Sequence, residues 1–115
     1  MTITSHVAGK VQVVAVSGRV DHANAGPLEL ALAPFLVQCK ADGQPLLLDF
    51  SQVDYISSVG LRVLMLAAQQ AKAQKGQVAV AALTEVVKVV FEVSRFNMVL
   101  RVFASVEQGV EALSS

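Results

Sequence analysis

The chain has 115 residues, a length that fits one domain and leaves little room for two. Hydrophobic residues make up 54% and charged residues 16%, a balance that excludes a disordered chain and supplies one core. Nine basic and nine acidic residues give a formal net charge of zero, which argues against direct binding of nucleic acid. No apolar stretch approaches the roughly 18 residues of a spanning helix, and no signal peptide is readable, so we expect a soluble, cytoplasmic protein without membrane insertion.

The first half of the chain predicts two strands, a helix and a third strand. The segments Thr2–Val7 and Val11–Val16 are rich in β-branched residues and are separated by a turn, which is typical of a hairpin. Asn24 is a candidate N-cap for a helix, and Pro34 is expected to kink that helix. The continuous apolar segment Pro45–Phe50 predicts a buried strand that is stopped by polar residues.

The second half repeats this alternation of helices and strands. Ser57 or Ser58 is expected to cap a helix that runs to about Lys75. Further elements are predicted as a strand, a helix, a strand and a short final helix capped by Ser105, over 77–82, 84–95, 99–103 and from 105 onward. In the helix over 84–95 the polar residues recur at helical spacing, which places four apolar residues on the opposite, buried face: Val86, Val87, Val90 and Phe91.

Apolar strands that alternate with helices predict an α/β fold. We expect one domain over residues 1–115, with a mixed β-sheet of about four to five strands packed against about four helices. The motifs of nucleotide-binding loops, zinc peptidases and serine hydrolases are absent, so no enzyme activity, catalytic residue or cofactor is expected. Cys39 is the single cysteine and is interpreted as a small buried residue late in a helix; with two histidines in the whole chain, no metal site is expected.

The segment from Asp54 to Arg62, DYISSVGLR, carries the functional information because it places two serines at the start of a helix. The first turn of a helix has unpaired N–H groups and a partial positive charge, so a phosphate on one of these serines would lie in a site suited to an anion. Gly60 has no side chain and is expected to let a partner approach the turn closely. An ordinary N-cap followed by a small residue is the alternative interpretation of the same pattern.

Two motifs of the chain resemble the STAS domain of bacterial anti-sigma factor antagonists. Residues 18–21, GRVD, are similar to the family's G-x-[LV]-D. Residues 46–64, LLLDFSQVDYISSVGLRVL, are similar to the family's V-x-[LV]-D-[LF]-S-x-[VL]-x-[FY]-[IM]-[DS]-S-[SAT]-G-[LI]. The resemblance extends over nearly the whole chain, and the second motif is the more specific one.

This resemblance implies a regulatory binding module. The family's phosphoacceptor is the serine two residues before the motif glycine, which corresponds to Ser58. Family members bind an anti-sigma factor that is a serine kinase of the histidine-kinase-like ATPase class, release it when phosphorylated, and are reset by a PP2C-type phosphatase. The expected partner-binding residues are Asp21, Asp54, Ser57, Ser58, Val59, Gly60, Leu61 and Arg62.

The chain departs from the best-known antagonists at Ser57, where they carry an aspartate before the acceptor. The alternative function is therefore a STAS subunit of an ABC-type lipid-transport complex, which docks on its ATPase without being phosphorylated. For the antagonist we expect the phosphate to act by local repulsion from Asp21 and Asp54, with little change of fold.

Overall fold

A computed structural model describes residues 1–114 of the chain. The elements follow in the order β1 (Thr2–Ala8), β2 (Val11–Val20), α1 (Ala25–Val37), β3 (Leu46–Ile56), α2 (Ser58–Ala73), β4 (Val78–Ala81), α3 (Glu85–Val93), the 3-10 helix η1 (Phe96–Met98), β5 (Arg101–Phe103) and α4 (Val106–Ser114). The predicted alternation of strands and helices is confirmed, and Ser105 caps α4 as expected, because its Oγ accepts a hydrogen bond from the N–H of Gln108 at 3.1 Å.

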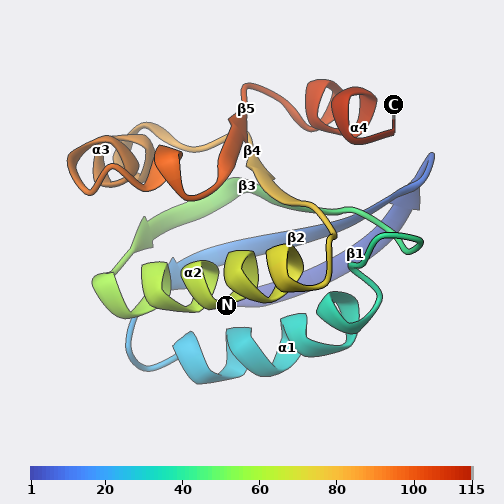
Figure 1. Cartoon of the computed structure of the whole chain (residues 1–115). Coiled ribbons are helices and arrows are strands. Elements are labelled where there is room, and N and C mark those ends of the chain that lie inside the picture. Colours follow the sequence, from blue (N-terminus) through green and yellow to red (C-terminus); the bar gives the residue numbers. More distant parts are fainter. Residues whose placement is uncertain (115) are drawn as a thin grey trace.

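The five strands form one mixed sheet in the order β1-β2-β3-β4-β5. β1 and β2 form an antiparallel hairpin, whereas β2, β3, β4 and β5 run parallel to their neighbours. Figure 1 shows α1 and α2 below the sheet and α4 above it. The predicted fold class is thereby confirmed, and no helix within residues 1–114 is long and apolar enough to cross a membrane.

Both faces of the sheet are covered, which explains the continuous apolar sequence of β3. Leu46, Leu48 and Phe50 are fully buried in the larger core cluster, to which α1, α2 and α3 contribute. Leu47 points to the other face and joins the smaller cluster beneath α4, together with Val11. The high hydrophobicity of the chain therefore follows from a sheet that is enclosed between two layers of helices.

The ends of β2 and β3 differ from the prediction, because both strands are longer than their apolar segments. β3 continues through its polar residues to Ile56, so no loop separates it from Ser57. Beyond Asp49 it pairs with β2 alone and leaves β4, and the carbonyl oxygen of Val53 accepts a hydrogen bond from Thr84 Oγ1 at 2.8 Å instead. The strand therefore leads directly into the two serines at the start of α2.

Two expectations about the helices are wrong, those for Val86 and Cys39. In α3 Val87 and Phe91 are buried, but Val86 is 54% exposed, so the buried face is narrower than the prediction. α1 runs from Ala25 to Val37 with Pro34 inside it, so the proline does not end the helix. Cys39 is buried as expected, but it lies beyond the end of that helix rather than within it.

Candidate functional site

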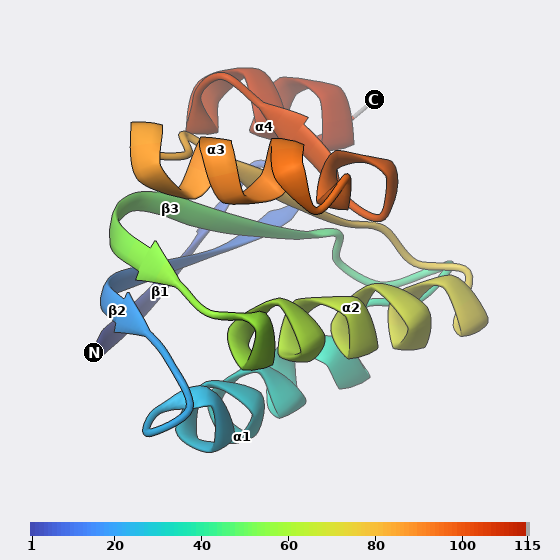
Figure 2. The ribbon, with the colours of Figure 1, turned by 90° about the vertical axis from the view of Figure 1, so that its left-hand side faces the viewer.

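β2 and β3 end next to each other, and each leads into the first turn of a helix (Figure 2). Val20 pairs with Ile56 as the last residues of the two strands, and the N–H of Ser57 donates a hydrogen bond to the carbonyl oxygen of Val20 at 2.9 Å. Because Asp21 follows Val20, the structure places Asp21 next to the start of α2. The parallel topology thus brings together two segments that lie more than thirty residues apart in the sequence.

The two serines at the start of α2 have different roles in the structure. Ser57 is the N-cap: its backbone is extended, and its Oγ accepts a hydrogen bond from the N–H of Gly60 at 3.2 Å. Ser58 is the first residue of the helix and is exposed, and its hydroxyl forms no hydrogen bond within residues 1–114. Since the cap occupies Ser57, Ser58 presents the free hydroxyl of the pair.

Gly60 faces the core and not a partner. A Cβ atom at this position would lie 2.8 Å from Ile56 Cγ1, 2.8 Å from Val20 Cγ1 and 3.0 Å from the carbonyl oxygen of Val20. The absence of a side chain therefore allows α2 to pack against the ends of β2 and β3, which corrects the expectation that it lets a partner approach. Leu61 is 9% exposed and belongs to the same core cluster.

The remaining predicted site residues form a surface. Ser58, Asp54 and Arg62 are exposed, and Val59 is 43% exposed, whereas Asp21 and Ser57 are half-buried. The side chain of Asp54 makes no hydrogen bond or ion pair with any residue that the structure describes. The exposed members therefore present one hydroxyl, one apolar side chain and one positive charge on the first turns of α2, and one negative charge near the end of β3.

Comparison with known proteins identifies the family. A family model described as "Mlab, STAS domain" matches residues 3–102. The chain belongs to the STAS domain family. This STAS domain is 33% identical over 115 residues to BtrV of Bordetella bronchiseptica, a protein named as an anti-sigma factor antagonist; the match covers 100% of the chain and 97% of BtrV.

Solved structures share the fold of this STAS domain. An anti-sigma factor antagonist from Mycobacterium paratuberculosis superposes with a TM-score of 0.87 at 22% identity, covering 99% of this chain and 94% of that one. The antagonist SpoIIAA in its unphosphorylated form superposes with a TM-score of 0.77 at 15% identity, covering 96% and 95% of the two chains. At these identities the likeness concerns the fold.

In this STAS domain Arg19 and Tyr55 join the site, although the sequence analysis did not select them. The guanidinium carbon of Arg19 lies 4.6 Å from the centroid of the Tyr55 ring, and its Nε lies 3.6 Å from Asp21 Oδ2. Cation–π contact and ion pairing thus hold this arginine beside Asp21. The spacing of Arg19 and Asp21, which puts both on one face of an extended segment, was the available signal.

Asn24 is the N-cap residue of α1, as expected, but its side chain shapes the loop that presents Asp21 and forms no cap bond. Its Oδ1 accepts a hydrogen bond from the N–H of Asp21 at 2.8 Å, and its Nδ2 donates to the carbonyl oxygen of Arg19. Asp21 Oδ1 in turn accepts from the N–H of Ala23 at 3.0 Å. The expected cap bond is absent from the structure of this segment because the Asn24 side chain turns back toward β2.

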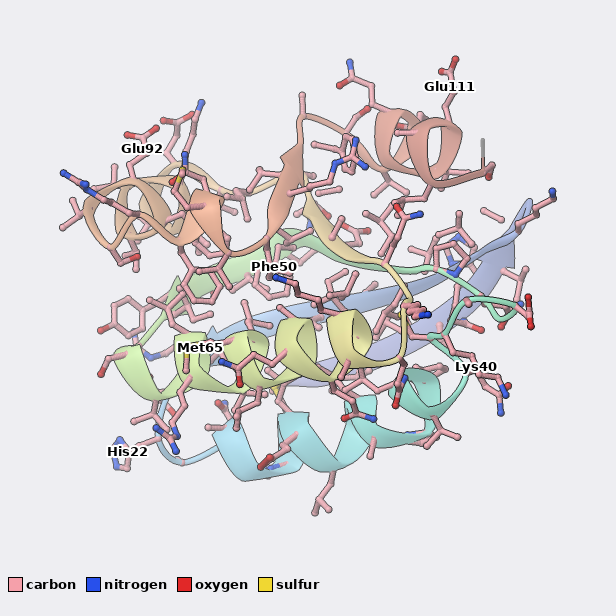
Figure 3. The ribbon with its side chains drawn as sticks, in the orientation of Figure 1. His22, Lys40, Phe50, Met65, Glu92 and Glu111 are labelled. Carbon is pink, nitrogen blue, oxygen red and sulfur yellow. The ribbon has the colours of Figure 1, made fainter. Side chains whose placement is uncertain are left out.

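The best-formed groove of the structure lies away from the site. A groove of about 350 Å³ between α2 and β5 has Lys72 and Lys75 in its lining, at the opposite end of α2 from Ser58. Within residues 1–114 no group of three His, Cys, Asp or Glu side chains could hold a metal ion. Figure 3 shows His22 at the same end of the molecule as the start of α2. An exposed helix start of this kind suits contact with another protein.

Proposed function

We propose that this protein is an anti-sigma factor antagonist whose partner binding is switched by phosphorylation of Ser58. The observation that carries the proposal is that the two serines at the start of α2 have different roles. Ser57 caps the helix, and Ser58 presents a free, exposed hydroxyl. The identity to BtrV over the whole chain supports the antagonist role. A likeness in fold to SpoIIAA in its phosphorylated form, with a TM-score of 0.69, supports a fold that accommodates phosphate.

The proposed cycle is the one that the resemblance to anti-sigma factor antagonists implies, placed on the residues of this site. Unphosphorylated protein, in the cytoplasm, captures an anti-sigma factor that is a serine kinase of the histidine-kinase-like ATPase class, and contacts it through Asp21, Ser58, Val59 and Arg62. The kinase transfers the γ-phosphoryl group of ATP to the hydroxyl of Ser58, which loses its proton, and ADP leaves. A phosphate adds about −1.5 to −2 charges to a surface that already carries Asp21 and Asp54. The complex then dissociates, and a PP2C-type phosphatase hydrolyses the phosphoserine and restores the starting state.

Incubation with a candidate kinase of this class and ATP, followed by intact mass and site mapping, tests the proposal. We expect one phosphate per chain, located on Ser58, and no phosphorylation of Ser58→Ala. Ser58→Ala should keep binding the kinase, whereas authentic phosphoprotein should bind it about 5–150-fold more weakly. Ser58→Asp should reproduce part of this loss, because a carboxylate carries less charge than a phosphate.

Three results would contradict the proposal. Phosphate mapped to Ser57 alone would reassign the acceptor, and equal affinities of the two forms would remove the switch. Stable capture of an ABC-type ATPase without phosphorylation would favour the role of a lipid-transport subunit. Far-ultraviolet circular dichroism of each form serves as the control that loss of binding does not reflect loss of fold.

A further inference from the structure

Arg62 lies one helical turn after Ser58 on the same face of α2. In a helix, residues four apart have Cβ atoms about 5–6 Å apart, and side chains lean toward the N-terminus. The long side chain of Arg62 is therefore within reach of a phosphate on Ser58. An acidic group that precedes a basic group by four residues is also the more favourable orientation of such a pair.

Arg62 is an uncommitted cation in this structure. It is exposed, and its guanidinium makes no ion pair, hydrogen bond or ring contact with the residues that the structure describes. Arg19, the other arginine of the site, is already paired with Asp21 and stacked on Tyr55. A new anion at Ser58 would thus meet one free arginine from its own helix and one whose charge is partly neutralised.

We propose that Arg62 is the counter-charge of a phosphate on Ser58 within the same chain. This inference rests on the proposed phosphorylation of Ser58. A guanidinium binds phosphate oxygens through two parallel N–H donors, and these bonds are stronger than those between neutral groups. The Arg62 guanidinium, which is free in the unphosphorylated protein, is then bound to the phosphate of its own chain. A partner that places a carboxylate against Arg62 loses that contact when Ser58 is phosphorylated.

The simpler interpretation of Arg62 is a solvated surface residue. Its aliphatic stem would cover Val59 and Leu66, which lie on the same side of α2 and are 43% and 37% exposed. This interpretation predicts that a phosphate on Ser58 forms no contact with the Arg62 guanidinium. The ionisation of the phosphate distinguishes the two, because covering apolar side chains does not change it.

The experiment uses the full chain with phosphoserine incorporated genetically at position 58, so that no kinase is needed. Phosphorus NMR measures the second pKa of the phosphoserine in this protein and in its Arg62→Gln, Arg62→Lys and Lys72→Gln variants. We expect the pKa to rise by about 0.2–0.4 of a pH unit in Arg62→Gln, because the dianion loses its counter-charge. Arg62→Lys should give a smaller rise, since lysine keeps the charge but not the paired donors.

Lys72→Gln is the matched control, because it removes one positive charge from the other end of the same helix. It should leave the phosphoserine pKa unchanged. An equal pKa in Arg62→Gln and the parent phosphoprotein, or an equal rise in Lys72→Gln, would overturn the inference. Because the phosphate is installed without a kinase, this result is independent of whether a kinase modifies Ser58, and failed kinase labelling counts against the proposed function alone.

Discussion

At the scale of single residues, Gly60 shows how internal packing accounts for a glycine that the sequence suggests is a contact point. Its missing Cβ is the space into which Val20 and Ile56 fit, and these two side chains close the core beneath the first turn of α2. Both neighbours are fully buried and have no free volume to move into. The glycine thus sets the distance between the helix that carries Ser58 and the strand ends that carry Asp21.

Gly60→Ala is therefore expected to destabilise the fold by about 1–3 kcal/mol, the usual cost of overpacking a core. Gly26→Ala is the matched control, because a Cβ atom there meets nothing within 4 Å in α1 and alanine favours helix. Urea unfolding should give a lower midpoint for Gly60→Ala, and an unchanged or higher one for Gly26→Ala. Equal midpoints for Gly60→Ala and the parent would mean that α2 shifts freely to admit the methyl group.

At the scale of elements, the structure decides which of the two serines caps α2, a choice that the sequence left open. Ser57→Ala removes the acceptor of the Gly60 N–H, so we expect a loss of about 0.5–2 kcal/mol in the free energy of unfolding. Ser58→Ala removes an exposed hydroxyl and should stay within about 0.5 kcal/mol of the parent. Thermal or urea unfolding of both variants checks this, and the reverse order of stability would assign the cap to Ser58.

The elements themselves could be predicted from periodicity, because both faces of the sheet and one face of each helix must be apolar. The register between β2 and β3 at the site could not be predicted. Two bulges interrupt the pairing of β2 and β3, so that Val14 pairs with Leu48, an offset of 34 residues, whereas Arg19 pairs with Tyr55, an offset of 36. Uninterrupted pairing would have placed Arg19 opposite Val53. Gly18, which has a φ of 98° and lies at the second bulge, was the available signal, because an isolated glycine in a strand often marks a bulge.

Some features of the candidate site could likewise be predicted from the sequence, and others could not. Ser58 and Asp21 could be placed together because the carboxyl ends of parallel strands meet at one edge of a sheet. The sequence did not predict which residues of the first turns of α2 are buried. Gly60 and Leu61 lie on the buried side of the helix, whereas Val59 and Arg62 lie on the exposed side. That distinction depends on where β3 ends, and its true end at Ile56 lies six residues beyond the end of its apolar segment at Phe50.

At the scale of the whole molecule, one end of the sheet carries the candidate site and the other end connects structural elements. The carboxyl end of β2 and β3 presents the functional surface, whereas the opposite end ties α1 to α2 and β4. Gln74 Nε2 donates to the carbonyl oxygens of Leu36 and Cys39 at 2.8 and 2.7 Å, and Cys39 Sγ donates to the carbonyl oxygen of Gln77 at 3.1 Å. Figure 3 shows Lys40 at this end, far from His22.

The Cys39 thiol makes this second end sensitive to alkaline pH. Burial raises the pKa of the thiol above its ordinary value of 9.0, and the backbone hydrogen bonds offset this only in part. The folded protein therefore holds the thiol proton at a pH where the unfolded chain has released it. This contribution to stability is fully present below about pH 9 and is lost as the pH rises through the higher pKa of the folded state.

We therefore expect the free energy of unfolding of the parent to fall more steeply above about pH 9 than that of Cys39→Ala, with parallel curves at lower pH. The two proteins share every other side chain, so the difference between the two curves isolates the thiol. Cys39→Ala should also be less stable at neutral pH, because the Gln77 carbonyl loses a donor and a small cavity forms. Urea unfolding at a series of pH values measures both effects. Curves that stay parallel through the alkaline range would show that the thiolate forms as readily in the folded protein as in the unfolded chain.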